Sequence, residues 1–403
     1  MYNPADKIND LQYFGEFGGV NPSITDSSTF TFLRAETMEE LFEIEKEGCY
    51  LYSRHTNPSN KYLSDALALM EGTEAAHVSG SGMGSISSVL LQLCSAGDEL
   101  VASRMIYGGT YALMKNFLPK FDIQTRFVDF TKPETVESSI TPKTKVLYCE
   151  MLSNPLLEVT DLPAIKAIAT KHNLILVVDN TFSPMIFSPA QMGAHVVLHS
   201  LTKFINGTSD ALGGVACGSK EFIHSMMDVN HGASMLLGPV LDGFRSNQIL
   251  KNLHSLHIRM VQHSKNAQYV AERMKEDGLR VVYPGLKNHP QHELYTRLMN
   301  PGFGYGGMLV LDAHSPQKAN ELMELMQDNN VGYLAVSLGF FKTLFSNPGG
   351  STSSEIPEEE QKAMGLSHGM IRFSIGLDMD IARSYKKMRA CMKEVGLLKQ
   401  ELV

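Results

Sequence analysis

Short apolar runs alternate with longer amphipathic segments from about Ala75 to Gly218. The runs AAHVS, ELVAS, TRFVD, KVLYCE, LILVVDN, AHVVLHS and GGVACG are apolar along most of their length. Segments with helical periodicity, such as ISSVLLQLCSAG and LPAIKAIATKHN, lie between several of them. Strands that are apolar throughout and joined through helices indicate an α/β fold with a parallel sheet covered on both faces.

The remaining sequence predicts an arm and a second domain. Residues 1–60 are rich in Gly, Pro, Asn, Ser and Thr, and only AETMEELFEIEKEG has helical periodicity. After a long helical region at 240–276, strand and helix signals restart in LRVVYPG and GYGGMLVLDAHS, and the chain closes on an amphipathic helix near DIARSYKKMRACMKEVGLL. Segment 345–358 contains too many turn residues to be core. We therefore expect an arm at 1–60, a large domain at 61–255 and a smaller α+β domain at 256–403.

Charge and composition exclude several classes of partner. The net charge of −8 and the pI near 6.0 give no general attraction to nucleic acid or to anionic lipid. The sequence has no signal-peptide pattern and no apolar stretch of membrane-spanning length. Its five cysteines are an odd number without metal-ligand spacing, which is typical of free thiols in a reducing compartment. These features predict a cytoplasmic protein without a nucleic-acid partner, a membrane partner or a metal site.

The segment HVSGSGMGSISS follows a predicted strand and opens a predicted helix. Backbone N–H groups and the helix dipole bind phosphate in such an arrangement. Gly80 and Gly82 are followed by Ser85 where a dinucleotide-binding GxGxxG pattern needs its third glycine, and no Lys-Ser/Thr pair completes a P-loop. A phosphate site of another class fits better, although a tight turn alone would also explain these glycines.

Three more chemically useful residues follow predicted strands: Tyr107, Asp179 and Lys203. Each alone has a structural explanation, as a packed tyrosine, a turn aspartate and a solvated or paired lysine. Because ligands of parallel sheets gather at the carboxyl ends of the strands, we expect the three to converge beside the glycine segment. A phosphate site, a ring contact, a carboxylate for a protonated ring nitrogen and a reactive amine together indicate pyridoxal 5'-phosphate.

The motifs SGMG, YGGT, SNP, VVDNTF, HSLTKFINGTSD and AVSLG…IRFSIGLD, in this order, resemble the pyridoxal-phosphate enzymes of Cys/Met metabolism, the cystathionine γ-synthase and methionine γ-lyase family. The resemblance runs from YSRHTNPSN to RFSIGLD, nearly the whole chain. It implies fold type I, the fold of aspartate aminotransferase, with a mainly parallel seven-stranded sheet sandwiched by helices and a smaller C-terminal α+β domain. It also implies a small amino-acid substrate and a homotetramer built as a dimer of active-site-sharing dimers.

The same resemblance implies roles for individual residues. Lys203 would bond to the cofactor and transfer protons, Tyr107 would stack on the ring and also move protons, and Asp179 would keep the pyridine nitrogen protonated. The remaining cofactor contacts would come from Gly82, Met83, Ser200, Thr202, Asn154 and, in the neighbouring subunit's site, Tyr52 and Arg54. The substrate contacts would come from Arg372, which grips the α-carboxylate, and from Asn154, Ser337 and Val336.

Val336 stands where cystathionine-handling members tend to carry a glutamate that receives the distal amine of the substrate. An apolar side chain there favours an uncharged tail, and thus a methionine γ-lyase or an O-acylhomoserine sulfhydrylase. Gly109 stands where methionine γ-lyases usually have a cysteine. The sequence also departs from the family pattern at four further positions near the expected substrate entrance, namely Phe340, Phe341, Lys342 and Asn347, and at Thr208.

Three functional hypotheses remain. The first is γ-elimination on a methionine-like amino acid, giving 2-oxobutanoate, ammonia and a thiol, with γ-replacement of the O-acetylhomoserine sulfhydrylase or cystathionine γ-synthase type as its alternative. The second is an aminotransferase on the same cofactor platform, which the family-specific arm disfavours. The third is a non-catalytic cofactor-binding protein, which the intact set Lys203, Asp179, Tyr107 and Arg372 disfavours.

Overall fold

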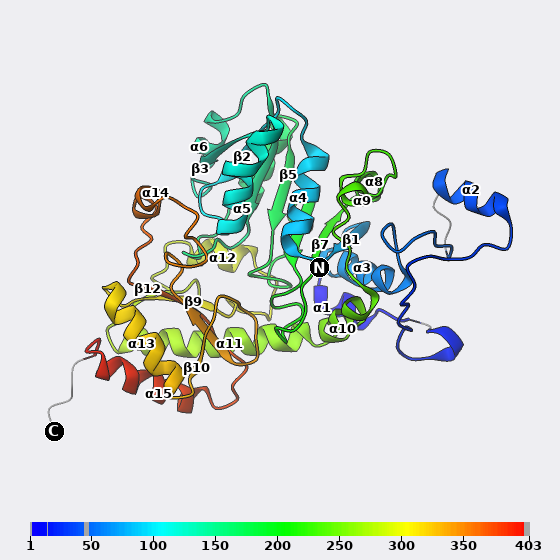
Figure 1. Ribbon diagram of the computed structural model, residues 1–403. Helices are drawn as coiled ribbons and strands as arrows, with labels where there is room; N and C mark the ends of the chain where they lie inside the picture. The colour runs from blue at the N-terminus through cyan, green and yellow to red at the C-terminus, as the bar shows by residue number, and fades with distance from the viewer. Residues whose placement is uncertain (1, 14, 44–47, 399–403) are drawn as a thin grey trace.

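The computed structural model describes residues 2–13, 15–43 and 48–398 and contains two sheets (Figure 1). The larger has the spatial order β1-β7-β6-β5-β4-β2-β3. Its strands are β1 (Ala75–Ser79), β2 (Glu99–Ser103), β3 (Gln124–Val128), β4 (Thr144–Glu150), β5 (Ile175–Asp179), β6 (Val196–Ser200) and β7 (Gly214–Gly218). Every predicted apolar run of this region forms one of these strands, which confirms the mainly parallel seven-stranded sheet.

One strand departs from the parallel arrangement that the hydrophobic pattern alone predicted. Strand β7 runs antiparallel to both β6 and β1, while the other neighbours in the sheet are parallel. The physical reason lies in the connection, because residues 201–213 join β6 to β7 through a loop without a crossover helix. Adjacent strands joined without a crossover run in opposite directions.

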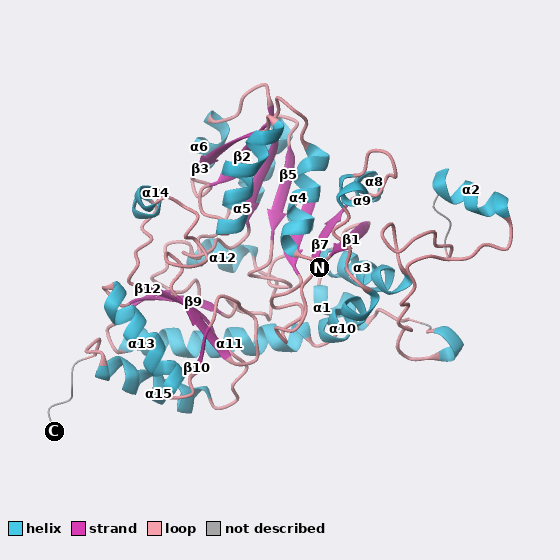
Figure 2. Ribbon diagram, viewed as in Figure 1, coloured by secondary structure: helices cyan, strands magenta, loops and turns pink. Residues whose placement is uncertain are grey.

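Helices cover both faces of the larger sheet (Figure 2). Leu100 and Ala102 belong to one buried cluster, with side chains of α4, whereas Val101 between them belongs to another, with side chains of α3 and α7. This alternation explains why the strands are apolar throughout. The helices before residue 256 are α1 (Pro4–Asn9), α2 (Ala35–Glu43), α3 (Pro58–Glu71), α4 (Gly82–Leu93), α5 (Gly108–Ala112), α6 (Pro133–Ser138), α7 (Leu162–Lys171), α8 (Lys220–Met226), α9 (Ala233–Leu237) and α10 (Gly243–Leu253). Shorter 3₁₀ or π segments are Glu16–Gly18, Leu113–Phe117, Leu118–Phe121 and Pro189–Met192.

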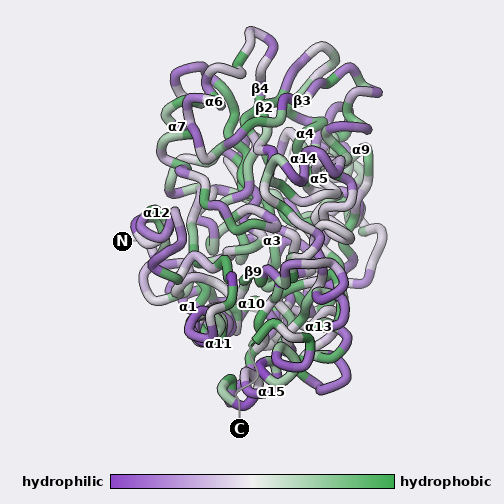
Figure 3. Tube along the Cα trace, turned by 90° about the vertical axis from the view of Figure 1, so that its left-hand side faces the viewer, coloured by the Kyte–Doolittle hydropathy of each residue, from purple (hydrophilic) through white to green (hydrophobic). Residues whose placement is uncertain are grey.

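The smaller sheet is mixed and has the order β10-β11-β12-β9-β8. Its strands are β8 (Arg280–Val282), β9 (Met308–Asp312), β10 (Gly332–Leu334), β11 (Thr343–Ser346) and β12 (Met370–Ser374). The accompanying helices are α11 (Leu256–Glu276), α12 (His292–Leu298), α13 (Pro316–Asp328), α14 (Glu358–Ala363) and α15 (Ile381–Glu394). Helices α11, α13 and α15 carry both hydrophobic and hydrophilic residues (Figure 3), and their apolar side chains form a core of their own with β9 and β12.

Two details differ from expectation. The predicted helical region at 240–276 consists of two helices, α10 and α11, interrupted at His254 and Ser255. Segment 345–358 starts inside β11 and is not free of core residues, because Ile356 is 1% exposed and packs into the α4 side of the larger sheet. The loop therefore ties the smaller sheet to the larger one.

Within the predicted arm, α1 packs against α3 and contributes Ile8 to the core of the larger sheet, whereas the part that carries α2 extends away from the rest of the molecule (Figure 1). Helix α2 forms within AETMEELFEIEKEG, of which residues 44–47 lie outside the described residues. We propose the division into an arm at 1–60, a large domain at 61–255 and a small domain at 256–403. Its support is that α11 begins at Leu256 and that the smaller sheet has its own hydrophobic core.

Candidate active site

The carboxyl ends of the central strands open into one cavity of about 210 Å³. Most of the candidate residues line this cavity, although they come from distant parts of the chain. They are Gly82, Met83, Tyr107, Asn154, Asp179, Ser200, Thr202, Lys203, Val336 and Arg372. Tyr107, Asp179 and Lys203, which were expected to converge at the strand ends, thus line one cavity beside the glycine segment.

Lys203 lies in the loop that follows β6, and its amine is directed toward the smaller sheet. Its Nζ donates a hydrogen bond to Ser337 Oγ at 3.4 Å. Burial, together with the positive charge of Arg372, lowers the pKa of Lys203 from 10.5 to about 8. About a tenth of this amine is therefore neutral at pH 7, far more than for an ordinary lysine, and the neutral form is the one that a nucleophile or general base requires.

Asp179 ends β5 and is 8% exposed. Its Oδ1 accepts the Thr181 N–H at 2.9 Å and the Thr181 hydroxyl at 2.6 Å. Thr181 Oγ1 in turn accepts the Ser200 N–H at 2.8 Å, which links β5 to β6. Burial raises the pKa of Asp179, while the two hydrogen bonds from Thr181 act in the opposite direction by stabilising the carboxylate. The second Asp179 oxygen can therefore accept from a cationic N–H in the cavity.

The glycine segment forms the first turn of α4. Ser81 caps this helix, since its hydroxyl accepts the Gly84 N–H at 3.0 Å. The N–H groups of Gly82 and Met83 have no carbonyl one turn earlier and can bind an anion. A Cβ at position 82 would lie 2.9 Å from the Cβ of Ser200, so the close approach of this turn to β6 requires glycine.

Tyr107 precedes α5 and is 41% exposed at the cavity. Its ring lies over Gly109, where an added Cβ would stand 2.6 Å from Tyr107 Cε1. Partial burial, together with the negative charge of Glu355, raises the pKa of the Tyr107 hydroxyl. The glycine at 109 thus has a local reason, because any side chain there would compete with the tyrosine ring for space.

Arg372 reaches the cavity from β12 and is 3% exposed. Its Nη1 donates to Asn154 Oδ1 at 2.9 Å and to Thr352 Oγ1 at 3.4 Å. Burial lowers the pKa of Arg372 to about 10, so the guanidinium remains charged at neutral pH. A buried, oriented guanidinium is suited to bidentate binding of a carboxylate.

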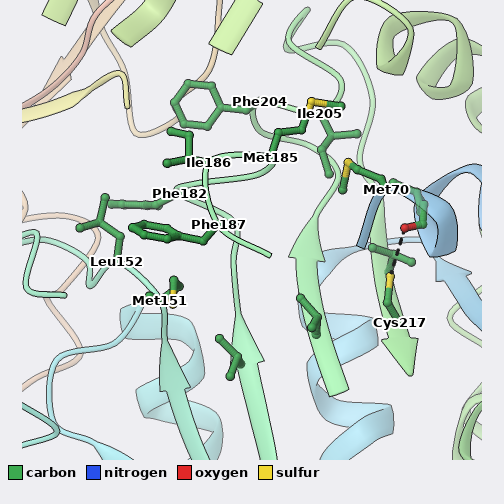
Figure 4. Packing of buried hydrophobic residues seen from close by; sticks show 14 of the residues in the cluster. Met70, Met151, Leu152, Phe182, Met185, Ile186, Phe187, Phe204, Ile205 and Cys217 are labelled. Atoms are coloured by element: carbon green, nitrogen blue, oxygen red, sulfur yellow. Dashed lines mark hydrogen bonds between the residues drawn. The ribbon is translucent and has the colours of Figure 1, made fainter. Parts of the chain in front are cut away.

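Much of the cavity lining is apolar. Its apolar side chains are Met83, Ile86, Leu152, Phe182, Leu212, Val336 and Leu338. Leu152 and Phe182 also belong to the packed hydrophobic core (Figure 4). An uncharged substrate tail would find matching surroundings here.

Tyr52 and Arg54 are not among the described residues that line this cavity. Arg54 Cζ lies 5.7 Å from the centroid of the Tyr52 ring, and Arg54 Nη1 donates to the carbonyl of Met235 at 3.1 Å. Arg54 instead lines a second cavity of about 600 Å³ at the base of the arm. The pair is thus outside the site of its own chain.

The unusual residues after β10 also lie outside the described lining of the cavity. Lys342 Nζ is 4.7 Å from the centroid of the Tyr333 ring, and the centroids of Phe340 and Phe341 are 4.5 Å apart. Asn347 binds backbone groups of His368 and Gly350, and Thr208 donates to Asp210 at 2.6 Å. These contacts favour a packing role over substrate selection.

Sequence reasoning missed several residues of the cavity. Glu150 ends β4 and lines the site, and the strand-end rule that selected Asp179 would have selected it as well. Thr352 enters from a loop of the smaller sheet, and no local pattern marked it. Other unpredicted lining residues are Ser81, Ile86, Leu152, Thr181, Phe182, Leu212 and Leu338.

Comparison with known proteins agrees with this geometry. The profile of the family described as Cys/Met metabolism PLP-dependent enzyme matches residues 7–381. The chain belongs to this family. Among Cys/Met metabolism enzymes, it is 45% identical to methionine gamma-lyase of Arabidopsis thaliana, over 93% of this chain and 86% of that protein. It is 32% identical to O-succinylhomoserine sulfhydrylase of Pseudomonas aeruginosa, over 90% of this chain and 88% of that protein.

The fold is similar to that of a solved family member. The structure of cystathionine gamma synthase from Xanthomonas oryzae, in complex with aminoacrylate and cysteine, superposes with a TM-score of 0.89. The two are 29% identical, over 98% of this chain and 99% of that one. The predictions of fold type I, of the family and of a pyridoxal-phosphate-dependent enzyme are therefore confirmed.

Pyridoxal phosphate is the cofactor of this Cys/Met metabolism enzyme. The residues present fit it, because the cavity joins a glycine cradle next to Ser200, a buried carboxylate held by Thr181 and a lysine with a lowered pKa. In the described part of the chain, no helix has the length and apolarity needed to cross a membrane.

Proposed function

We propose that this chain catalyses γ-elimination on methionine or a similar amino acid, giving 2-oxobutanoate, ammonia and a thiol. The observation that carries the proposal is a single cavity lined by the amine-bearing Lys203, by a buried arginine suited to a carboxylate, Arg372, and by the apolar side chain of Val336. Similarity to methionine gamma-lyase of Arabidopsis thaliana supports the same reaction.

Each candidate residue has a proposed place in this reaction. The residues that would hold the cofactor are Gly82, Met83, Ser200 and Thr202 at the phosphate, Asp179 at the ring nitrogen, Tyr107 and Asn154 at the ring, and Lys203 through a covalent bond. When bound, pyridoxal phosphate holds the amino group of the substrate covalently and takes up the electrons released at its carbon atoms.

Lys203 and Arg372 perform the steps that the protein itself contributes. Arg372 binds the α-carboxylate and, with Asn154 and Ser337, sets the orientation of the substrate. The neutral amine of Lys203 accepts the proton from Cα and passes it back to the cofactor-bound substrate. Neutral again, the same amine accepts a proton from Cβ, which allows the sulfur substituent to leave from Cγ. Tyr107, which stands at the open side of the cavity, can transfer a proton to the departing sulfur. Water completes the reaction by releasing ammonia and the 2-oxo acid.

The second candidate is γ-replacement, in which a thiol or sulfide adds where the leaving group departed. Similarity to O-succinylhomoserine sulfhydrylase of Pseudomonas aeruginosa favours it. The apolar side chain of Val336 in the cavity lining is compatible with an acyl ester as well as a thioether.

A substrate panel separates the candidates. The purified holoenzyme would be assayed with methionine, homocysteine, cystathionine and O-acetylhomoserine, each with and without added sulfide. We expect 2-oxobutanoate from methionine and homocysteine without sulfide. A strict requirement for sulfide would contradict the lyase and select the sulfhydrylase, whereas transfer of the amino group to a 2-oxo acid would select an aminotransferase.

We also propose a homotetramer in which pairs of subunits share active sites. Its support is the arm, which extends from the body and carries Tyr52 and Arg54 outside the cavity of its own chain (Figure 1). In this arrangement the two side chains bind the cofactor phosphate in the neighbouring subunit. Size-exclusion chromatography with light scattering tests the assembly.

A cytoplasmic location is also proposed, because the five cysteines are free thiols.

A further inference from the structure

Glu150 is a buried carboxylate of the cavity that the proposed reaction does not use. It ends β4 and is paired in register with Asp179 of β5, so the two side chains reach the same edge of the sheet. Glu150 is 6% exposed. A carboxylate this deeply buried needs strong donors to offset the loss of its hydration.

Each oxygen of Glu150 accepts a hydrogen bond from a different segment of the site. Oε1 accepts the backbone N–H of Tyr107 at 2.7 Å, and Oε2 accepts the backbone N–H of Asn154 at 2.8 Å. Tyr107 carries the ring on the cofactor side, and the Asn154 side chain accepts from Arg372 on the carboxylate side. One side chain thus spans the two halves of the site.

We propose that Glu150 is a positioning residue that fixes the Tyr107 ring and the Asn154–Arg372 pair relative to each other. The inference rests on the proposed roles of Tyr107 and Arg372. Both donors are backbone N–H groups, so only a proline at Tyr107 or Asn154 would remove them. The link between the two segments therefore depends on the two acceptor oxygens of Glu150. Loss of either oxygen as an acceptor leaves a buried N–H without its partner.

Glu150→Gln tests this arrangement with almost no change of shape. The glutamine amide retains one acceptor oxygen but presents an NH₂ group to the other N–H, so one of the two contacts becomes repulsive. We expect weaker binding of both ligands, by about tenfold each, since the loss of one buried acceptor is shared by both segments. Glu150→Asp keeps the carboxyl group and both oxygens but is one methylene shorter, and we expect smaller losses of the same kind.

The measurements avoid turnover. Pyridoxal 5'-phosphate is titrated into the apoenzyme, and L-norleucine, which has no leaving group at Cγ, is titrated into the holoenzyme while the visible absorption of the cofactor is followed. Glu158→Gln is the matched control, because Glu158 is a partly buried carboxylate of the neighbouring loop outside the lining of the cavity. This control should bind both ligands as the wild type does.

The two results that overturn the inference are distinct. Wild-type binding of both ligands by Glu150→Gln would show that Glu150 positions neither segment, and loss of only one ligand would show that it does not couple them. If Glu150→Gln does not fold, Glu150→Asp decides by the same criteria. A wild-type enzyme that binds both ligands but releases no 2-oxo acid from methionine would contradict the proposed function alone, because the binding comparison remains valid.

Discussion

Asp179 and Lys203 reach the cavity from the ends of neighbouring strands, β5 and β6, whereas Val336, Thr352 and Arg372 reach it from the smaller sheet and its loops. We call the side chains from the larger sheet the first wall of the cavity and those from the smaller sheet the second wall. Strand register determines the positions of the first-wall residues, since β4, β5 and β6 are paired residue by residue up to the site. The second wall depends on contacts between the two sheets. We infer that the wall of the larger sheet sets the chemistry and the wall of the smaller sheet sets the choice of substrate.

Replacement of Lys203 is the strongest test of the first wall. Lys203→Ala removes the proposed nucleophile and base, and we expect turnover to fall by at least about 10³-fold. Borohydride should no longer fix pyridoxal phosphate at position 203, and the cofactor should be lost on dialysis, because no covalent bond to residue 203 retains it. Steady-state kinetics and absorption spectra measure the two effects. Unchanged turnover in this variant would refute the assignment of Lys203.

Replacement of Arg372 tests the second wall. Arg372→Lys keeps the charge but loses the planar fork, and we expect KM for methionine to rise by about 30-fold or more with a smaller effect on kcat. Arg389→Lys, on α15 at the Asp277 ion pair, is the control and should leave KM unchanged. A normal KM in Arg372→Lys would mean that another group binds the carboxylate.

The two walls also differ in how far the sequence predicted them. AAHVS and ELVAS match the bounds of β1 and β2, and the strand-end rule placed Asp179 and Lys203 correctly at the cavity, because these features depend on local pattern. The burial of Ile356 and the approach of Thr352 depend on packing between segments far apart in the chain. Local hydrophobicity contains no signal for such contacts.

Lys203 in the first wall and Arg372 in the second interact electrostatically. The positive charge of Arg372 contributes, after burial, to the lowered pKa of Lys203, which is about 8. A lysine with a lowered pKa is neutral above that value, so its neutral fraction should rise about tenfold between pH 7 and pH 9. Reductive methylation of the apoenzyme, followed by peptide mass spectrometry, should therefore label Lys203 with a midpoint near pH 8. Arg372→Leu should move this midpoint upward, and an unchanged midpoint would rule out the influence of Arg372.

Gly109 leaves no room for a side chain beside the Tyr107 ring. Gly109→Ala places a Cβ against the Tyr107 ring, and since the ring can turn away, we expect kcat/KM to fall by about fivefold from its misplacement. The melting temperature should not fall, because alanine favours the helix α5 over glycine. Gly350→Ala is the control, as the nearest atoms to its Cβ, those of Asn347, are 3.6 Å away. Equal activity of the two variants would show that the ring has another resting place.

Replacement of Lys342 tests whether the unusual residues of the smaller domain affect the choice of substrate. Its Nζ lies over the Tyr333 ring, and it is not among the described residues that line the cavity. Lys342→Ala should therefore change KM for methionine by less than about twofold and lower stability by no more than about 1 kcal/mol, the range of an exposed cation–π contact. Lys342→Met, which keeps most of the side-chain length, separates packing from charge. If instead KM changed markedly for an amino acid with an acidic tail but not for methionine, Lys342 would be a selectivity residue, and the second wall would extend beyond the cavity to the loop after β10.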